Sequence, residues 1–380
     1  MKQSTDPIDL ADLQKMLIYI PPDLPRDDWA RMLMAAKSEF GDSAREIMQD
    51  WSAAAANYDR QAFNSTWKSI KAGGGVTIAS LVHEAKENGF RFAPVSKEDR
   101  KRLQAEQKRR EAARKQEEKA ERQQREQGYR IAKESAEKML RERAFVANPM
   151  HPYFVKKGIQ HEVRALNWVY QLYNTLLVPV CRFRTPRQGM KATDYITASP
   201  NIIESGGDGN ERNLVSDYSD NPLFELISLQ YIDEKGGKFF LKGGQTKGGF
   251  FPVRFDGHIL KIVICEGLAT AVTYATHYTP DAEVICAFNA RNLKDVAKEF
   301  KVRFPMAEIT IAGDNDRATE QKTGVNVGVV KAIEAARLVD GEVMIPAFAD
   351  DEPGTDWNDR FLLDNGHPSS QPWAGMGVTV

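Results

Sequence analysis

The sequence predicts a multidomain α/β protein: an N-terminal helical module, a long charged helix, a mixed basic subdomain and a mainly parallel α/β domain. Apolar residues recur at helical spacing through roughly residues 8–92, a densely charged stretch follows, and strand and helix patterns alternate from about residue 259. The chain has 380 residues, of which 42% are hydrophobic, so it is long enough for two or three domains with real cores.

Composition and pattern exclude several classes of protein. No apolar run approaches the ~20 residues that a membrane helix needs, and the first residues lack the basic-then-apolar pattern of a signal peptide. The 3 cysteines are scattered and form no Cys-x-x-Cys pair, so we expect neither a disulfide framework nor a zinc module. We expect a cytoplasmic protein that has no membrane partner.

The N-terminal module, predicted at residues 1–92, consists of short amphipathic helices. The apolar spacing predicts helices at 8–17, 27–36, 43–56, 59–71 and 78–88. Its tryptophans, Trp29, Trp51 and Trp67, are expected to anchor the core.

Residues 93–146 are predicted to form a charged helical linker. Between Lys97 and Gln127 there are 12 Lys/Arg and 8 Asp/Glu, and Leu103 is the only large apolar side chain. Acid–base pairs fall at helical spacing, which favours a solvated helix on the order of 70 Å long if it is continuous. Two interpretations stay open: a solvated linker, or a basic arm that also contacts nucleic-acid phosphates.

A basic subdomain is predicted at residues 147–255. Glycine turns separate strand patterns at 176–180, 226–232, 238–241 and 250–253, which indicates an antiparallel sheet, and a polar insert occupies about 182–224. The unit carries five lysines that could hold nucleotide or template phosphates, or could form a solvated face. They are Lys156, Lys157, Lys238, Lys242 and Lys247.

The α/β domain is predicted at residues 256–364 and a flexible tail at 365–380. Strand patterns occur at 259–265, 283–288, 308–312 and 342–346, with helix patterns at 268–277, 292–304 and 325–339. This alternation indicates a mainly parallel sheet with helices on both faces.

Acids follow the strands of this domain. Glu266 follows the first strand, Asp314 and Asp316 follow the third, and Asp356 lies beyond the fourth. Sites in open parallel sheets form at the carboxyl ends of strands, so these acids should converge there. Carboxylates that converge need a cation, and oxygen-only ligation favours Mg²⁺ or Mn²⁺, which support phosphoryl transfer. The alternative for Asp314 alone is a helix N-cap.

These residues resemble a known domain. Ile262-Val263-Ile264-Cys265-Glu266-Gly267, with Ala312-Gly313-Asp314-Asn315-Asp316 downstream, is similar to the Toprim domain shared by DnaG-type primases, topoisomerases and some nucleases. The Glu266–Ala271 segment resembles the version in primases of phages, plasmids and satellite elements, as does the preceding region with His151-Pro152-Tyr153 and Lys238–Gly244. The spacing of Trp51, Trp67 and Thr77-Ile78 is similar to the primase C-terminal type 2 module.

The resemblance implies roles for the acids and reveals departures from the family. It implies that Glu266 is the catalytic acid/base, that Asp314 and Asp316 bind metal, and that Asp356 is a further ligand. Housekeeping primases have another acid where this chain has Thr270, and they carry a zinc module that this chain lacks. A GxxxxGK[ST] loop is also absent from the sequence, so no helicase motor is expected within it.

The function implied is that of a mobile-element DNA primase with a DnaG-like core. Such an enzyme makes short RNA primers on single-stranded DNA from nucleoside triphosphates, with Mg²⁺ or Mn²⁺. A 3′-hydroxyl attacks the α-phosphorus and pyrophosphate leaves. The expected partner is a replicative helicase or a replication initiator acting in trans. The alternatives are a Toprim nuclease, in which the same acids activate water, and a non-catalytic replication adaptor.

Overall fold

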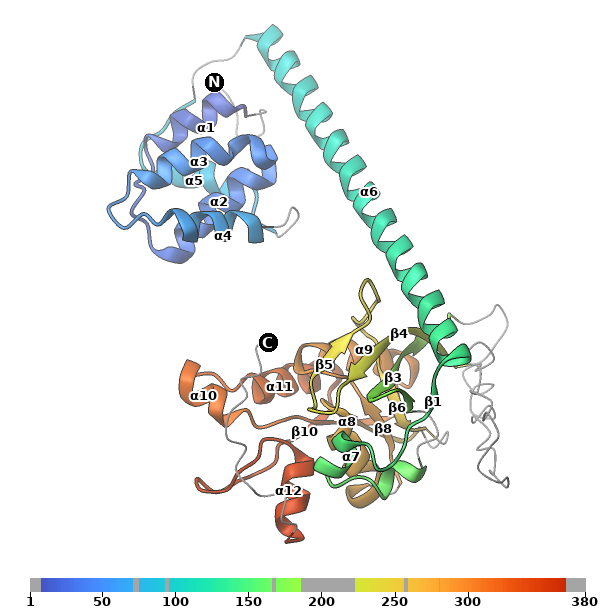
Figure 1. Ribbon diagram of the computed structural model, residues 1–380. Coiled ribbons are helices and arrows are strands. Elements are labelled where there is room, and N and C mark those ends of the chain that lie inside the picture. The colour runs from blue at the N-terminus through green and yellow to red at the C-terminus, as the bar shows by residue number, and fades with distance from the viewer. Residues whose placement is uncertain are drawn as a thin grey trace. The chain divides into compact units, whose positions relative to one another are not determined.

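The computed structural model describes residues 8–70, 75–92, 96–165, 169–185, 223–255, 259–279 and 281–366 (Figure 1). The chain divides into two compact units, residues 1–122 and 123–380, and each is described by itself. In the described residues, no helix is both long enough and apolar enough to cross a membrane.

The first unit is helical, as predicted. Its elements are α1 (Leu10–Leu17), α2 (Arg26–Phe40), η1 (Gly41–Ala44), α3 (Arg45–Ala53), α4 (Arg60–Ser69) and α5 (Ile78–Glu87). Trp51 and Trp67 are buried in one core, and the partly buried Trp29 packs against it. The Trp51 indole donates to the carbonyl of Ile20 at 2.9 Å, so the ring is held at both its apolar and its polar parts. The prediction that the tryptophans anchor this core is confirmed.

The charged stretch forms one helix, α6 (Lys97–Glu142). Its side chains at residues 115–127 are exposed, as expected for a solvated helix. The helix is not solvated along its whole length, because Leu103 near its start is buried. There Arg110 donates to the Ile8 carbonyl at 3.1 Å and Arg114 donates to the Ser38 carbonyl at 2.8 Å. Long side chains with apolar stems thus pack this part of the helix onto the first unit.

The last turns of α6 belong to the second unit. Ala132, Ala136 and Leu140 lie on one helical face and are buried. On the same part of the helix, Lys133 pairs with Glu225 at 2.6 Å. A small-residue face therefore lets α6 approach the first sheet closely.

The first sheet of the second unit is antiparallel, with the order β1-β2-β3-β4-β5. Its strands are β1 (Phe145–Val146), β2 (Tyr170–Leu172), β3 (Thr175–Phe183), β4 (Phe224–Ile232) and β5 (Lys238–Phe240), and α7 (Pro152–Lys156) precedes β2. Strands β3 and β4 pair as far as Phe183 opposite Phe224. The predicted insert connects these two ends, and residues 186–222 of it lie outside the described residues.

The second sheet has the order β10-β9-β7-β8-β6, and its first four strands are parallel. The strands are β6 (Phe251–Arg254), β7 (Lys261–Cys265), β8 (Glu283–Cys286), β9 (Glu308–Ala312) and β10 (Glu342–Met344). The helical elements are α8 (Leu268–Thr273), the π-helical turn η4 (Tyr274–Tyr278), η5 (Ala290–Asn292), α9 (Leu293–Arg303), α10 (Arg317–Thr323), α11 (Val327–Val339) and α12 (Trp357–Asp364).

Helices cover both faces of this sheet. Ile262 and Ile264 of β7 pack in one core with α9 and α11, whereas the alternate residues Val263 and Cys265 pack with α8 in another. The predicted mainly parallel α/β domain is therefore confirmed.

One strand lies in a different sheet from the one predicted. We expected residues 250–253 to continue the antiparallel sheet with β5, but β6 pairs with β8 at the edge of the second sheet. Pro252 has no N–H to donate, and an edge strand tolerates this loss. The first sheet keeps one bridge to this segment, in which the Cys181 amide donates to the Phe250 carbonyl at 2.8 Å. The predicted domain boundaries remain a proposal.

Candidate active site

The acids gather where parallel strands end. Cys265, the last residue of β7, pairs with Ala312, the last residue of β9. Glu266 and Asp314 therefore leave the sheet from adjacent strand ends, which is the edge where open α/β sheets form their sites. Asp356 reaches the same acids from a loop after β10 and begins α12.

Glu266 is held in an environment that favours its protonated form. Burial raises the pKa of this carboxyl to about 7, and the charges of Asp316 and Asp356 add to the rise. A hydrogen bond from the Ala290 amide and the nearby Lys238 act in the opposite direction. Its Oε2 atom is buried and has no hydrogen-bond partner among the described residues. A carboxyl with a pKa near 7 can both accept and release a proton at neutral pH.

Asp314 is perturbed in the same direction. Burial, followed by the charges of Glu266 and Asp356, raises its pKa well above the ordinary value. Its Oδ1 atom is also buried without a partner in the described part of the chain. Charged groups are rarely left in this way unless a ligand or cation completes them.

Asp316 is held more firmly than Asp314. Its Oδ2 atom accepts a hydrogen bond from the Gly328 amide at 3.0 Å. A Cβ atom at residue 328 would lie 2.4 Å from the Asp314 carbonyl oxygen, so only glycine lets α11 approach the turn this closely.

Asp356 differs from both, because each of its carboxylate oxygens accepts a hydrogen bond. Oδ1 accepts from the Asp359 amide at 2.8 Å as the N-cap of α12, and Oδ2 accepts from Lys157 Nζ at 2.9 Å. Although burial alone would raise it, Lys157 and the cap bond hold the pKa of Asp356 below its ordinary value. Lys157 also pairs with Asp359 at 3.3 Å.

Asp359 is a site residue that the sequence reasoning missed. A signal for it was present, because Asp-x-x-Asp at the start of a helix has the spacing of a capping box, and the structure contains that box. The role of Lys157 as the partner of both acids had no such signal.

Lys238 is the second lysine near the acids. It lies at the start of β5, and a Cβ atom on Gly267 would be 3.8 Å from its ammonium nitrogen. Its charge lowers the pKa of Glu266 and of Asp314, against the larger effect of burial. Lysines from the first sheet's subdomain thus stand beside acids of the second sheet.

The other predicted lysines are placed differently. Lys156 donates to the Lys235 carbonyl at 3.1 Å, and Lys247 lies 3.8 Å from Asp295 of α9. Lys242 is exposed. The structure therefore brings Lys157 and Lys238 to the acids and leaves these three further out.

The residues fit a divalent cation of the magnesium class. The two unpartnered oxygens come from Glu266 and Asp314, and all the candidate ligands are carboxylates. Within the described ranges, no three His, Cys, Asp or Glu side chains are arranged to hold one ion by themselves. A cation bound here would need waters or substrate phosphates beside one or two carboxylates, which is the usual way in which Mg²⁺ is bound.

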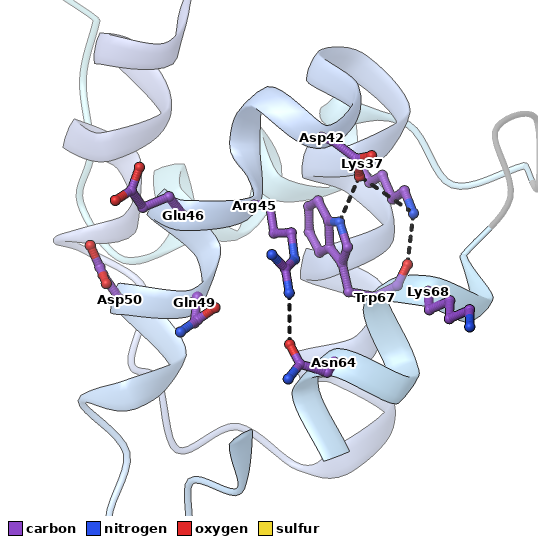
Figure 2. Close-up of a pocket in the computed structure, with 9 residues that line it drawn as sticks. All are labelled: Lys37, Asp42, Arg45, Glu46, Gln49, Asp50, Asn64, Trp67 and Lys68. Atoms are coloured by element: carbon purple, nitrogen blue, oxygen red, sulfur yellow. Dashed lines mark hydrogen bonds and ion pairs between the residues drawn. The ribbon is translucent and has the colours of Figure 1, made fainter. Parts of the chain in front are cut away.

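A separate groove of about 890 Å³ lies on the helical module (Figure 2). It is lined by Lys37, Asp42, Arg45, Glu46, Gln49, Asp50, Asn64, Trp67 and Lys68. Two of its cations are already engaged, because Lys37 donates to the Trp67 carbonyl at 2.7 Å and Arg45 donates to Asn64 at 2.8 Å. Acids and bases are mixed along the groove, so its charge does not select one class of ligand.

Two family models match the chain. The family described as Primase C terminal 2 (PriCT-2) matches residues 13–85, and the Toprim domain matches residues 261–366. The acids described above lie within the second match. The chain therefore carries both of the modules that its sequence resembles.

Curated relatives match about a third of the chain. Two proteins of Escherichia coli, each described as DNA primase TraC, are 39% identical over 131 residues and 38% identical over 128 residues. These alignments cover 33% and 32% of this chain, but only 12% and 8% of the relatives.

Two solved structures show a weak likeness. One is the primase fragment of the bacteriophage T7 primase-helicase protein, with a TM-score of 0.31, 15% identity, and coverage of 56% of this chain and 68% of that chain. The other contains the bacteriophage T7 lagging-strand DNA polymerase with primase domains, with a TM-score of 0.33, 13% identity, and coverage of 54% and 81%. These scores are too low to establish a common fold.

Proposed function

We propose that this chain, which joins a PriCT-2 module to a Toprim domain, is a DNA primase. It would be a nucleotidyltransferase that makes short RNA primers on single-stranded DNA during replication of a phage, plasmid or satellite element. The observation that carries the proposal is the pair of buried carboxyls, Glu266 and Asp314, which have unpartnered oxygens and lie near the positive charge of Lys238. A polymerase needs negative side chains that bind a cation and positive side chains that bind a triphosphate, close to one another.

Asp314 and Asp316 are proposed to hold Mg²⁺ or Mn²⁺, and Asp356 is proposed as a further ligand. When bound, the cation would offset the negative charge of the acids and of the triphosphate. The hydrogen bond from Gly328 fixes one oxygen of Asp316, and Lys157 fixes one oxygen of Asp356, so the site is held in shape before a ligand arrives.

Glu266 is proposed as the general base. Because its pKa is about 7, it can accept the proton of the 3′-hydroxyl as that oxygen attacks the α-phosphorus of a nucleoside triphosphate. The new bond joins the 3′-oxygen to the α-phosphorus, the bond between the α-phosphorus and its bridging oxygen breaks, and pyrophosphate leaves. Lys238 and Lys157 are proposed to offset charge on the triphosphate. Lys156, Lys242 and Lys247 are proposed to bind template or nucleotide phosphates further out.

The test is incorporation of labelled ribonucleotides into short oligomers on single-stranded DNA with Mg²⁺ or Mn²⁺. Glu266→Gln keeps the shape but removes the base, so we expect a loss of about 10²- to 10⁴-fold. Glu299→Gln, a change of the same kind at an exposed residue of α9, is the matched control and should retain activity. Excess EDTA should stop the wild-type reaction.

Two outcomes would contradict the proposal. Metal-dependent degradation of the DNA without primer product would place the protein among Toprim nucleases. Primer synthesis that persists in excess EDTA would show that the reaction does not need a cation bound by the acids. The assay should include a replicative helicase or replication initiator, the proposed partner in trans, so that a requirement for it does not mask the activity.

A further inference from the structure

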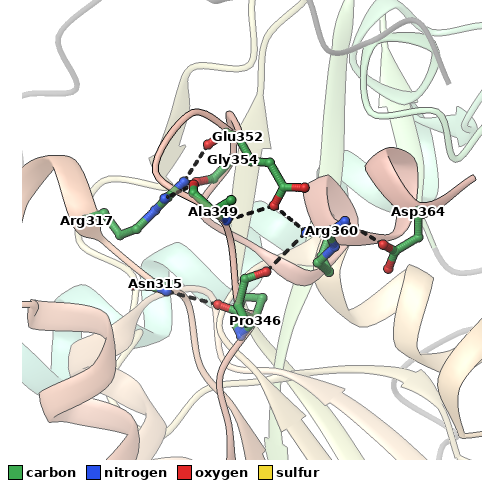
Figure 3. A network of polar contacts seen from close by, with 9 residues as sticks. Asn315, Arg317, Pro346, Ala349, Glu352, Gly354, Arg360 and Asp364 are labelled. Carbon is green, nitrogen blue, oxygen red and sulfur yellow. Dashed lines mark hydrogen bonds and ion pairs between the residues drawn. The ribbon is translucent and has the colours of Figure 1, made fainter. Parts of the chain in front are cut away.

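The aspartate turn, residues 314–317, follows β9. Its two residues that are not acids contact a different part of the chain from the one that its acids contact. In Asp314-Asn315-Asp316-Arg317, the two acids interact with Glu266, whereas Asn315 and Arg317 bond to the loop at residues 346–355 (Figure 3). This loop follows β10 and ends at Asp356. The turn therefore contacts both the acids and the loop that delivers the last of them.

Arg317 is the main contact with this loop. Its Nη1 atom donates to the Ala349 carbonyl at 2.7 Å, and its Nη2 atom donates to the Glu352 carbonyl at 2.6 Å. Nη2 also lies 3.5 Å from the Gly354 carbonyl. The guanidinium carbon is 5.0 Å from the centre of the Phe348 ring. A planar fork with several donors can bridge carbonyls that a single ammonium cannot reach together.

Asn315 holds the two ends of the same loop. Its side-chain amide donates to the Pro346 carbonyl at 2.9 Å, and its backbone amide donates to the Thr355 carbonyl at 2.6 Å. The second bond fixes the residue directly before Asp356.

Glu352 and Arg360 connect the same loop to α12. The Glu352 carboxylate accepts from the Ala349 amide at 2.9 Å and from Arg360 at 2.7 Å. Arg360 belongs to α12, the helix that Asp356 caps. The loop is thus tied to the aspartate turn by Asn315 and Arg317, and to α12 by Arg360 (Figure 3).

We propose that Asn315 and Arg317 are positioning residues, which fix the 346–355 loop to the aspartate turn and so hold Asp356 beside Asp314 and Lys157. Neither side chain touches the reacting groups in this role. The inference rests on the proposed function for the part that concerns metal binding, because it assumes that these acids share a cation.

The test compares Arg317→Met and Arg317→Lys with Arg337→Met in the full chain. Arg337 is an exposed arginine in the last turn of α11 and serves as the matched control. Two quantities are measured: binding of Mn²⁺, from the electron paramagnetic resonance signal of the free ion, and amide hydrogen exchange. Loss of a direct partner of a metal ligand typically weakens affinity by about 10- to 100-fold. Because Arg317 acts through the loop, Arg317→Met should weaken Mn²⁺ binding by about 10-fold, the lower end of this range. Arg317→Lys should fall between this variant and wild type, and Arg337→Met should bind as wild type does.

Amide hydrogen exchange tests this inference independently of the proposed function, because it reports on the loop and not on metal binding. Arg317→Met should speed exchange in residues 346–355 and leave β7 and β9 unchanged. Unchanged exchange in the loop would overturn the inference, as would Mn²⁺ binding equal to that of wild type. A wild-type chain that binds no Mn²⁺ would instead overturn the proposed function and the metal-binding part of the inference. If Arg317→Met does not fold, Asn315→Ala provides the same comparison, because it removes the bond to Pro346.

Discussion

The tryptophans of the helical module and two acids at the acidic edge of the second sheet differ in whether their polar atoms have hydrogen-bond partners. In the module, the indole N–H groups of Trp29, Trp51 and Trp67 each donate to an acceptor, at 3.0, 2.9 and 2.8 Å. At the acidic edge, buried oxygens of Glu266 and Asp314 have no partner among the described residues. Satisfied groups stabilise a fold, whereas unsatisfied charges are retained at a cost where a ligand can use them. The first region is organised for packing, and the second has the features that the proposed function requires for binding.

The largest effect on the free energy of unfolding should come from a substitution in the core of the helical module. Trp51→Ala removes a ring that is 8% exposed, together with its bond to the Ile20 carbonyl, and should destabilise the module by about 3–5 kcal/mol. Trp29→Ala, at a partly buried ring of the same core, is the matched control and should cost less. Denaturant unfolding followed by far-UV circular dichroism measures both. Equal, small losses would show that the module does not depend on its tryptophans.

A smaller effect, of opposite sign, should come from the acidic edge. Asp314→Asn removes a charge that burial disfavours, so the metal-free protein should gain unfolding free energy at pH 8. In the folded state the pKa of Asp314 is raised above 3.8, so the folded chain keeps a proton that the unfolded chain releases. Stability therefore falls as pH rises through and above this value, and the gain from Asn should nearly vanish near pH 4.

The control for this prediction is Asp340→Asn, at an exposed residue whose positive φ asparagine also tolerates. It should change stability little at either pH. Primer synthesis by Asp314→Asn should be lost at pH 8 although the protein is more stable there. A loss of stability at pH 8 would mean that the Asp314 charge is compensated within the folded chain.

The two regions also differ in how far the sequence predicted them. The helices of the module were predicted from apolar periodicity, and the mainly parallel sheet that contains β7, β8 and β9 was predicted from the alternation of strand and helix patterns. Helix α10 has no buried residues, so no apolar face could reveal it. Strand β6 was assigned to the wrong sheet, because a short apolar run does not specify its partner.

At the site, Glu266 and Asp314 could be found because their positions directly after strands indicate their place in the fold. The bond between Lys157 and Asp356 could not be found, because the two residues are 199 positions apart and neither has a pattern that points to the other. The capping box of α12 lay within reach of sequence reasoning, since it depends on four consecutive residues. Local spacing thus predicted the acids, and the tertiary fold decided which of them are compensated.

The smallest effect should appear in α6, which connects the two kinds of region. Ala120 lies in its exposed middle, whereas Ala136 is 0% exposed in the core of the second unit. Glycine costs about 0.5–1 kcal/mol in a helix, because it has more freedom in the unfolded chain. Ala120 is exposed, so a local loss of helix stability there should not affect the folded cores. Ala120→Gly should therefore only speed local amide exchange, by about 2- to 5-fold, and leave the unfolding free energy unchanged. At Ala136 the same change also removes a buried methyl group worth about 0.8 kcal/mol, and should lower the stability of the second unit.

Wild-type exchange should already be faster at residues 115–127 than at 132–140. If Ala120→Gly lowered the unfolding free energy as much as Ala136→Gly does, the middle of α6 would be part of a cooperative core, and the charged stretch would be more than a solvated connection.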